Sequence, residues 1–166
     1  MTDNLPQDII DLARKVVEEN KALGRKIVVA ESCTGGLVTA ALTEIAGSSA
    51  VLEAGYVTYS NEAKQKMLGV PSDIIDTFGA VSCACAWAMA QGALKVSGAD
   101  VAVAISGIAG PGGGSPQKPV GTVVFARAIR GQDEEEALAE ERQLDGSSRS
   151  TVRHQAALVA LELLLP

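Results

Sequence analysis

The spacing of apolar residues along the chain separates segments that favour helix from segments that favour strand. Residues 5–23 carry apolar side chains every three to four positions, which is the period of an amphipathic helix, and Pro6 and Gly24 suit its first turn and its end. The run 100–106 is short and almost entirely apolar, which is typical of a strand covered on both faces. The predicted strands are residues 26–30, 51–59, 100–106 and 120–129.

Polar and small residues mark where the other segments begin and end. Ser82 is placed to cap a long alanine-rich helix, and Ser147 or Ser148 to cap the last one. Residues 134–144 are ambiguous, because their glutamate and alanine content favours a helix whereas their place after a hairpin turn favours an edge strand; we expect the strand. The helices predicted after the first are residues 35–45, 61–68, 72–78, 82–97 and one that ends at residue 165. This alternation predicts one α/β domain over residues 1–166, with helices on both faces of the sheet.

Composition narrows the class of protein. The chain has 166 residues, of which 47% are hydrophobic but only one is Trp, two are Tyr and two are Phe, so its core is aliphatic. A net charge of −6 without a clustered basic surface argues against a nucleic-acid partner. Residues 1–4 are polar, and no apolar run approaches the roughly 20 residues that span a bilayer, so we expect a cytoplasmic protein with no membrane partner.

The cysteines do not form a recognisable framework. Cys33, Cys83 and Cys85 are odd in number and lack the spacing of a disulfide scaffold. A Cys-x-Cys pair with a single histidine in the chain gives no credible zinc site, so we expect no metal. Cys83 and Cys85 are expected to pack near a helix start, whereas Cys33 lies next to a candidate nucleophile and leaves a thiol-based activity as an alternative.

The segment 31–36, with the sequence ESCTGG, is the first candidate for chemistry. It joins an apolar strand to a predicted helix, so its serine, Ser32, lies at a strand-to-helix turn. The two glycines let other atoms approach the backbone, and the helix start supplies unpaired N–H groups suited to a developing oxyanion. A hydroxyl beside such donors is the arrangement used in acyl transfer. In the alternative interpretation, Ser32 or Thr34 is only the N-cap of the helix.

A serine nucleophile needs a base, and the chain offers two kinds. His154 is the only histidine, but it lies inside the last predicted helix, where a solvated or packed role is favoured. Lys64 lies in the first turn of a predicted helix, where a cation opposes the helix dipole and where burial lowers a lysine pKa. In the alternative, Lys64 is an exposed lysine that pairs weakly with Glu62 or Glu53. Lys66 is expected to be such an exposed lysine.

Three further features could bind or assist a substrate. Tyr59 could relay a proton or hydrogen-bond the serine, or it could be a strand-end aromatic with a solvated hydroxyl. Arg149 and Arg153 are four residues apart on one helix face, where an anion such as phosphate could rest between them; otherwise they are solvated near Asp145. The glycine- and proline-rich loop 107–119 follows an apolar strand, so it could contact a nucleotide or be a flexible connection.

Several segments, in this order and spacing, resemble the C-terminal domain of the competence/damage-inducible protein CinA. They are AESCTGG (30–36), YSNEAK (59–64), GAVS (79–82), SGIAGP (106–111) and KPVGT (118–122). The resemblance covers roughly residues 5 to 165, without the N-terminal domain of longer members. It implies a three-layer α/β/α domain with a mixed, mostly parallel sheet. It also implies hydrolysis of nicotinamide mononucleotide to nicotinate mononucleotide and ammonia, with no cofactor or metal, and a homodimer or higher homo-oligomer.

The resemblance also assigns roles to residues. It implies that Ser32 is the nucleophile, Lys64 the base and Tyr59 its neighbour, and that Ser106 contacts substrate or assists the hydroxyl network. Backbone N–H groups of residues 34–36 would hold the oxyanion. The implied substrate-binding residues are Thr34, Gly35, Gly36, Ser106, Gly107, Gly110, Arg149 and Arg153. The competing function is a non-catalytic nucleotide-binding or regulatory module linked to competence or the DNA-damage response.

Overall fold

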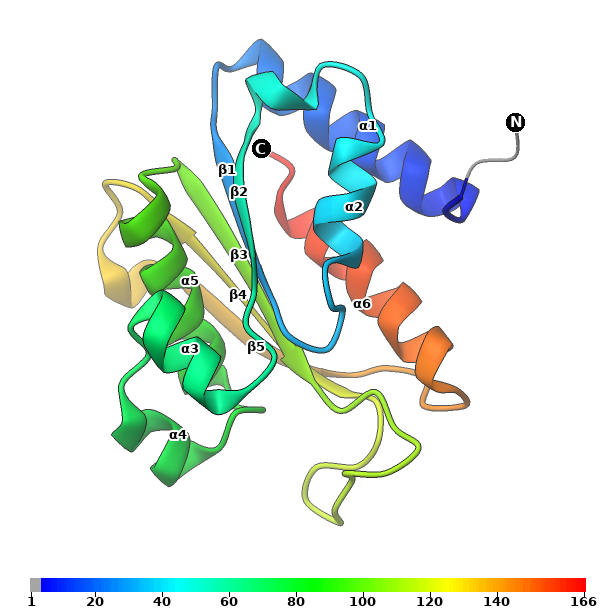
Figure 1. Ribbon diagram of the computed structural model, residues 1–166, viewed down its shortest axis with the longest axis vertical. Helices are drawn as coiled ribbons and strands as arrows, with labels where there is room; N and C mark the ends of the chain where they lie inside the picture. Colours follow the sequence, from blue (N-terminus) through cyan, green and yellow to red (C-terminus); the bar gives the residue numbers. More distant parts are fainter. Residues whose placement is uncertain (1–3) are drawn as a thin grey trace.

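Five strands form one sheet in the order β2-β1-β3-β4-β5 (Figure 1). The strands are β1 (Ile27–Glu31), β2 (Leu52–Val57), β3 (Val101–Gly107), β4 (Thr122–Ile129) and β5 (Leu138–Gln143). β1 pairs in parallel with β2 and β3, whereas β4 is antiparallel to β3 and β5. Only β4 therefore runs against the other strands, and the expected mixed, mostly parallel sheet is confirmed. The computed structural model describes residues 4–166, so residues 1–3 of the polar start considered above lie outside the described residues.

Helices cover both faces of the sheet, as predicted (Figure 1). One layer consists of α1 (Gln7–Ala22), α2 (Leu37–Thr43) and α6 (Arg149–Leu163), and the other of α3 (Asn61–Leu68), α4 (Ser72–Phe78) and α5 (Cys83–Ser97). Two short 3₁₀ helices, η1 (Ser48–Ala50) and η2 (Glu134–Glu136), lie in connections. Within residues 4–166, none of the helices combines the length and apolar composition that crossing a bilayer requires.

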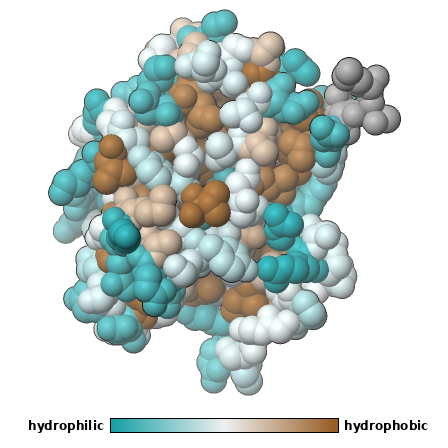
Figure 2. Space-filling model, in the orientation of Figure 1, coloured by the Kyte–Doolittle hydropathy of each residue, from teal (hydrophilic) through white to brown (hydrophobic). Residues whose placement is uncertain are grey.

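Side-chain size differs between the two faces of the sheet. On β3, Val101, Val103 and Ile105 face the layer of α1, α2 and α6. Ala102 and Ala104 face the α5 layer, where small strand residues allow the alanine-rich α5 to pack close to the sheet. The face of the molecule in Figure 2 shows apolar residues in separate patches among hydrophilic ones. Two large clusters of buried apolar residues lie between the sheet and the two helix layers.

Two close contacts fix α5 against its neighbours. A Cβ at Gly92 of α5 would lie 1.9 Å from the carbonyl oxygen of Leu68 at the end of α3, so only glycine fits this crossing. At the other edge, the indole N–H of Trp87 donates to the carbonyl oxygen of Glu134 at 3.0 Å and joins α5 to η2.

The predicted helix bounds agree closely for α3, α4 and α6. α3 and α4 have the predicted bounds, and α6 begins after Ser148, whose hydroxyl accepts from the Thr151 N–H. The helix predicted over 35–45 begins later, because Gly35 and Gly36 have φ values of 60° and 97° that a helix cannot accept. Residues 134–144 are an edge strand only in part.

The 3₁₀ turn at the start of that segment has a local cause. The Asp133 side chain accepts from the Glu135 N–H and closes the turn at Glu134–Glu136. Pairing with β4 then begins at Leu138. The predicted strand is therefore correct for β5 and wrong for the first residues of the segment.

Candidate active site

The candidate residues gather at the carboxyl ends of the parallel strands. Ser32 directly follows β1, and its N–H donates to the carbonyl oxygen of Ile105 on β3 at 2.9 Å. Thr58 follows β2, and its N–H donates to the carbonyl oxygen of Glu31 at 2.9 Å. Ser106 lies at the end of β3 and is buried. The sheet register therefore brings residues from three strand ends to one place.

A buried carboxylate holds the turn that carries Ser32. Glu31 is fully buried and accepts hydrogen bonds from the N–H groups of Val38 and Thr39 at 3.0 Å each, and from the Thr39 hydroxyl at 2.7 Å. Its negative charge lies at the N-terminus of α2, where the helix dipole stabilises it. Sequence reasoning missed this role, although an acidic residue between an apolar strand and a helix was the available signal.

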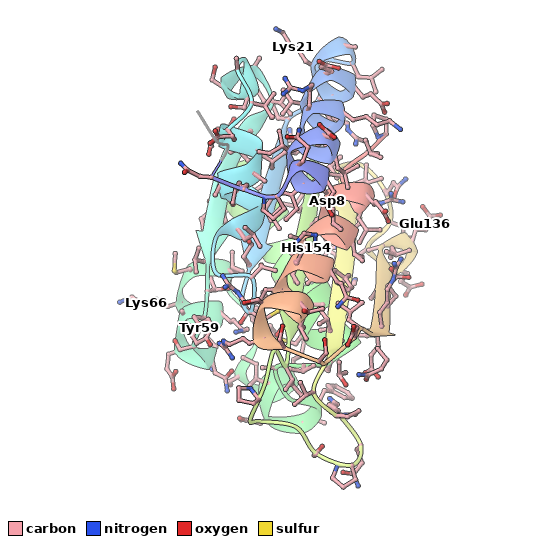
Figure 3. All side chains as sticks on the ribbon, turned by 90° about the vertical axis from the view of Figure 1, so that its right-hand side faces the viewer. Asp8, Lys21, Tyr59, Lys66, Glu136 and His154 are labelled. Atoms are coloured by element: carbon pink, nitrogen blue, oxygen red, sulfur yellow. The ribbon has the colours of Figure 1, made fainter. Side chains whose placement is uncertain are left out.

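Lys64 reaches the serine from the opposite helix layer. Ser60 caps α3 by accepting from the Ala63 N–H, so Lys64 lies in the first helical turn, as predicted. Its side chain is 1% exposed, and its Nζ lies 3.0 Å from Ser32 Oγ. The alternative of an exposed lysine is therefore wrong for Lys64, whereas Lys66 is exposed and points outward (Figure 3).

Backbone carbonyl oxygens surround the Lys64 amine. Nζ of Lys64 donates to the carbonyl oxygens of Thr58 at 2.8 Å and Tyr59 at 3.1 Å. Burial lowers the pKa of Lys64 below the ordinary lysine value of 10.5. A neutral amine has two N–H bonds and one lone pair. In the structure Nζ also donates to Ser32 Oγ at 3.0 Å. Because carbonyl oxygens can only accept, Ser32 is the one of these three partners whose hydroxyl could donate to the lone pair of a neutral amine.

A cavity of about 270 Å³ opens onto this pair. It is lined by Ser32, Cys33, Tyr59, Asn61, Lys64, Ala80, Val81, Ser106, Gly107, Ile108, Ala109, Gly110, Gly112, Gly113 and Arg149. The loop predicted over 107–119 thus forms one wall. Ser32, Ser106, Gly107, Gly110 and Arg149 are the predicted site residues, besides Lys64 and Tyr59, that line this cavity.

Thr34, Gly35, Gly36 and Arg153 are not among the residues that line this cavity. The outer sides of the glycines face other groups: a Cβ at Gly35 would lie 3.6 Å from Nη2 of Arg153, and one at Gly36 would lie 3.5 Å from Val57. The glycines allow the positive φ values of the turn.

The backbone donors of the turn also differ from the expectation. The Gly35 N–H donates to the Ser32 carbonyl oxygen at 3.0 Å, so it is not available to an oxyanion. Among residues 4–166, no acceptor hydrogen-bonds the N–H groups of Cys33, Thr34 or Gly36. Of these three residues only Cys33 lines the cavity.

The two arginines do not share an anion site. Arg149 donates to the carbonyl oxygen of Gly110 at 2.6 Å and to the Tyr59 hydroxyl at 3.2 Å, at the rim of the cavity. Arg153 instead donates to the carbonyl oxygens of Cys33 and Thr34. The two guanidinium groups diverge because each is held by a different backbone segment, and a single anion between them is not supported.

Tyr59 contributes in a way that was not expected. The residue is 62% exposed, and its hydroxyl accepts a hydrogen bond from Arg149 rather than bonding to Ser32. Its carbonyl oxygen, not its hydroxyl, contacts Lys64. The residue turns outward after β2, so the backbone faces the amine while the side chain faces the rim.

His154 has no part in the site. Its Nε2 lies 2.8 Å from Oδ2 of Asp8 on α1, away from Tyr59 at the cavity rim (Figure 3). The hydrogen bond from His154 lowers the pKa of the Asp8 carboxyl. The single histidine therefore makes a surface hydrogen bond between α1 and α6, and a Ser-His-Asp triad is not formed.

Burial raises the pKa of all three cysteine thiols. Cys33 is 5% exposed, and burial raises the pKa of its thiol to about 11, so the thiolate is rare at neutral pH. Cys85 is buried in the α5 layer and Cys83 packs against it. No group of three His, Cys, Asp or Glu side chains within residues 4–166 is arranged to hold a metal ion.

The chain is similar in sequence to a known protein family and to several of its members. The family model described as "CinA C-terminal domain" matches residues 9–166. Nicotinamide-nucleotide amidohydrolase PncC of Escherichia coli (strain K12) is 48% identical over 165 residues, which are 99% of this chain and 95% of that protein. A CinA-like protein of Akkermansia muciniphila is 51% identical over 140 residues, 84% of this chain. The chain spans only about a third (33%) of the length of that longer relative.

A solved structure agrees over the whole fold. The crystal structure of competence/damage inducible protein CihA from Agrobacterium tumefaciens superposes with a TM-score of 0.93 at 48% identity, covering 98% of this chain and 97% of that one.

Proposed function

The chain belongs to the CinA C-terminal domain family, and we propose that it hydrolyses the carboxamide of nicotinamide mononucleotide to nicotinate mononucleotide and ammonia. The observation that carries the proposal is the buried Lys64 amine 3.0 Å from the Ser32 hydroxyl, at the wall of a cavity. Full-length similarity to a protein named for this reaction supports the choice of substrate.

The proposed chemistry is a serine–lysine mechanism. Ser32 Oγ bonds to the carboxamide carbon while its proton passes to Lys64 Nζ. The carbonyl oxygen becomes an oxyanion beside the Cys33 N–H. The C–N bond then breaks, and Lys64 returns the proton to the leaving nitrogen as ammonia. Lys64 next deprotonates a water molecule that attacks the acyl-enzyme, and the released Ser32 oxygen regains a proton.

Ammonia release from nicotinamide mononucleotide by the purified protein tests the proposal. Steady release with equimolar nicotinate mononucleotide is the expected result. Binding of the nucleotide without turnover would overturn it and favour the regulatory module. Chelator-treated and untreated protein are assayed side by side. Because the proposed mechanism needs no metal, both should release ammonia at the same rate.

Arg149 is expected to bind the substrate phosphate. It is the cationic side chain of the cavity rim, already oriented by Gly110 and Tyr59. Replacing Arg149 by alanine is expected to raise KM for nicotinamide mononucleotide about tenfold or more, since a hydrogen bond to a charged group contributes roughly 1.5–3 kcal/mol. Nicotinamide riboside, which lacks the phosphate, is the control substrate and its KM should change little. Equal effects on both substrates would remove the assignment.

Cys33 is expected to be dispensable as a thiol. Replacing Cys33 by alanine keeps the backbone N–H and removes a buried thiol of high pKa, so kcat should stay within about threefold of wild type. Ammonia release by the C33A protein is the measurement. A loss as large as that of a Ser32 variant would instead identify thiol chemistry.

A further inference from the structure

Arg153 connects α6 to the turn that carries the candidate nucleophile. From the second turn of the helix, its Nε donates to the Cys33 carbonyl oxygen at 3.2 Å and its Nη2 to the Thr34 carbonyl oxygen at 3.1 Å. Cys33 and Thr34 are the two residues that directly follow Ser32. The guanidinium also lies over the outer side of Gly35, 3.6 Å from where a Cβ would be.

The geometry of this contact restrains the turn. A guanidinium is planar and presents its donors at a fixed spacing, so bonding two successive carbonyl groups holds both peptide planes in one orientation. In a trans peptide the C=O and N–H point in opposite directions, so the same contact also directs the Thr34 N–H away from the arginine. Glu31 restrains the turn through α2, and Arg153 restrains its other side.

A role as a ligand for an anion fits Arg153 poorly. The side chain is not among those that line the cavity, and two of its donor groups are already used by the protein. Arg149, one helical turn earlier, faces the cavity rim instead. Two arginines on one helix therefore have separate surroundings, which predicts separate kinetic effects.

We propose that Arg153 is a positioning residue, which holds the turn of residues 32–35 so that Ser32 Oγ stays within hydrogen-bonding distance of Lys64. It acts through backbone carbonyl groups and touches no substrate. The predicted effect on turnover rests on the proposed function, whereas the predicted effect on the reactivity of Ser32 does not.

The test compares Arg153→Gln and Arg153→Lys with a matched control. Arg130 also bonds a backbone carbonyl with Nε and Nη2, that of Ala99 at 3.1 and 2.8 Å, but does not line the active-site cavity. For each protein kcat, KM, Tm and the rate of Ser32 sulfonylation by phenylmethylsulfonyl fluoride are measured, with the labelled residue identified by mass spectrometry.

Arg153→Gln is expected to lower kcat about ten- to hundredfold, the effect of a small misplacement of reacting groups, with KM changed less than about threefold. Sulfonylation should slow by a similar factor. Arg153→Lys keeps the positive charge but not the planar pair of N–H donors. Its kcat and its rate of sulfonylation should therefore lie between those of Arg153→Gln and wild type. Arg130→Gln should lower Tm without changing kcat or labelling.

Three outcomes would overturn the proposal. A higher KM with unchanged kcat would identify Arg153 as an anion ligand. Unchanged kcat and unchanged labelling would show that the turn needs no such restraint. Equal losses in the Arg153 and Arg130 variants would show a general effect of stability. If wild type releases no ammonia but labels at Ser32, the proposed function fails, and the labelling comparison still decides the role of Arg153.

Discussion

Replacement of Ser32 by alanine is expected to lower kcat for nicotinamide mononucleotide by at least about 10³-fold, because within residues 4–166 the Ser32 hydroxyl is the one that hydrogen-bonds the Lys64 amine. Ser32 is 7% exposed, and alanine removes only one oxygen from this buried site. Lys64 keeps its bonds to two carbonyl groups. Binding of the nucleotide, measured by calorimetry, should therefore stay close to that of wild type while ammonia release is lost.

Ser49→Ala is the control for this variant. Ser49 is exposed in η1, before β2 and outside the cavity, so loss of its hydroxyl should leave kcat and KM as they are. Retention of more than a small fraction of activity by the S32A protein would contradict the serine mechanism, because it would mean that water attacks the amide directly.

Replacement of Lys64 by methionine is expected to lower kcat about 10²- to 10⁴-fold, the contribution of a general base. Methionine fills much of the same buried space but cannot accept a proton. Lys64→Arg is the informative companion, because a guanidinium supplies a permanent positive charge and N–H donors but stays protonated at every accessible pH. Both variants should be nearly inactive in the ammonia assay; an active arginine variant would show that the cation, not the base, is needed.

The same lysine predicts two dependences on pH. Its neutral form is the active one, and burial lowers its pKa, so kcat/KM of wild type should rise with pH and level off below 10.5. In the unfolded chain the pKa returns to its ordinary value. Between the two values unfolding takes up a proton, so the unfolding free energy of wild type relative to Lys64→Met should rise with pH. Urea unfolding at several pH values measures this, and a falling difference would contradict a lowered pKa.

Local signals explain why much of the fold could be predicted. Caps such as Ser60 and Ser82 and stops such as Gly69 and Gly98 act within one helical turn, so α3 and α5 begin and end where the sequence indicates. The positions of the helix layers could also be predicted, since strands that are apolar on both sides need helices on both faces of the sheet. The segment before β5 departed from the prediction, because a single Asp133 side chain closed a turn there.

The candidate pair could be proposed from sequence, but not the surroundings of the pair. Ser32 and Lys64 each carry a local signal, a strand-to-helix turn and a cation at a helix start. The direction of Arg153 depends on how α6 packs against a turn 120 residues earlier in the chain, which no local pattern encodes. The outward turn of Tyr59 and the filled space beside Gly36 depend in the same way on neighbours distant in sequence.

The bond between Trp87 and Glu134 has a practical consequence for all of these experiments. Trp87 is the only tryptophan of the chain, so its fluorescence is the indole emission of a single known position. That position lies in the α5 layer and does not line the active-site cavity. The emission maximum therefore reports whether the sheet and its helices remain assembled. A variant that keeps the wild-type spectrum and loses ammonia release has lost chemistry rather than structure.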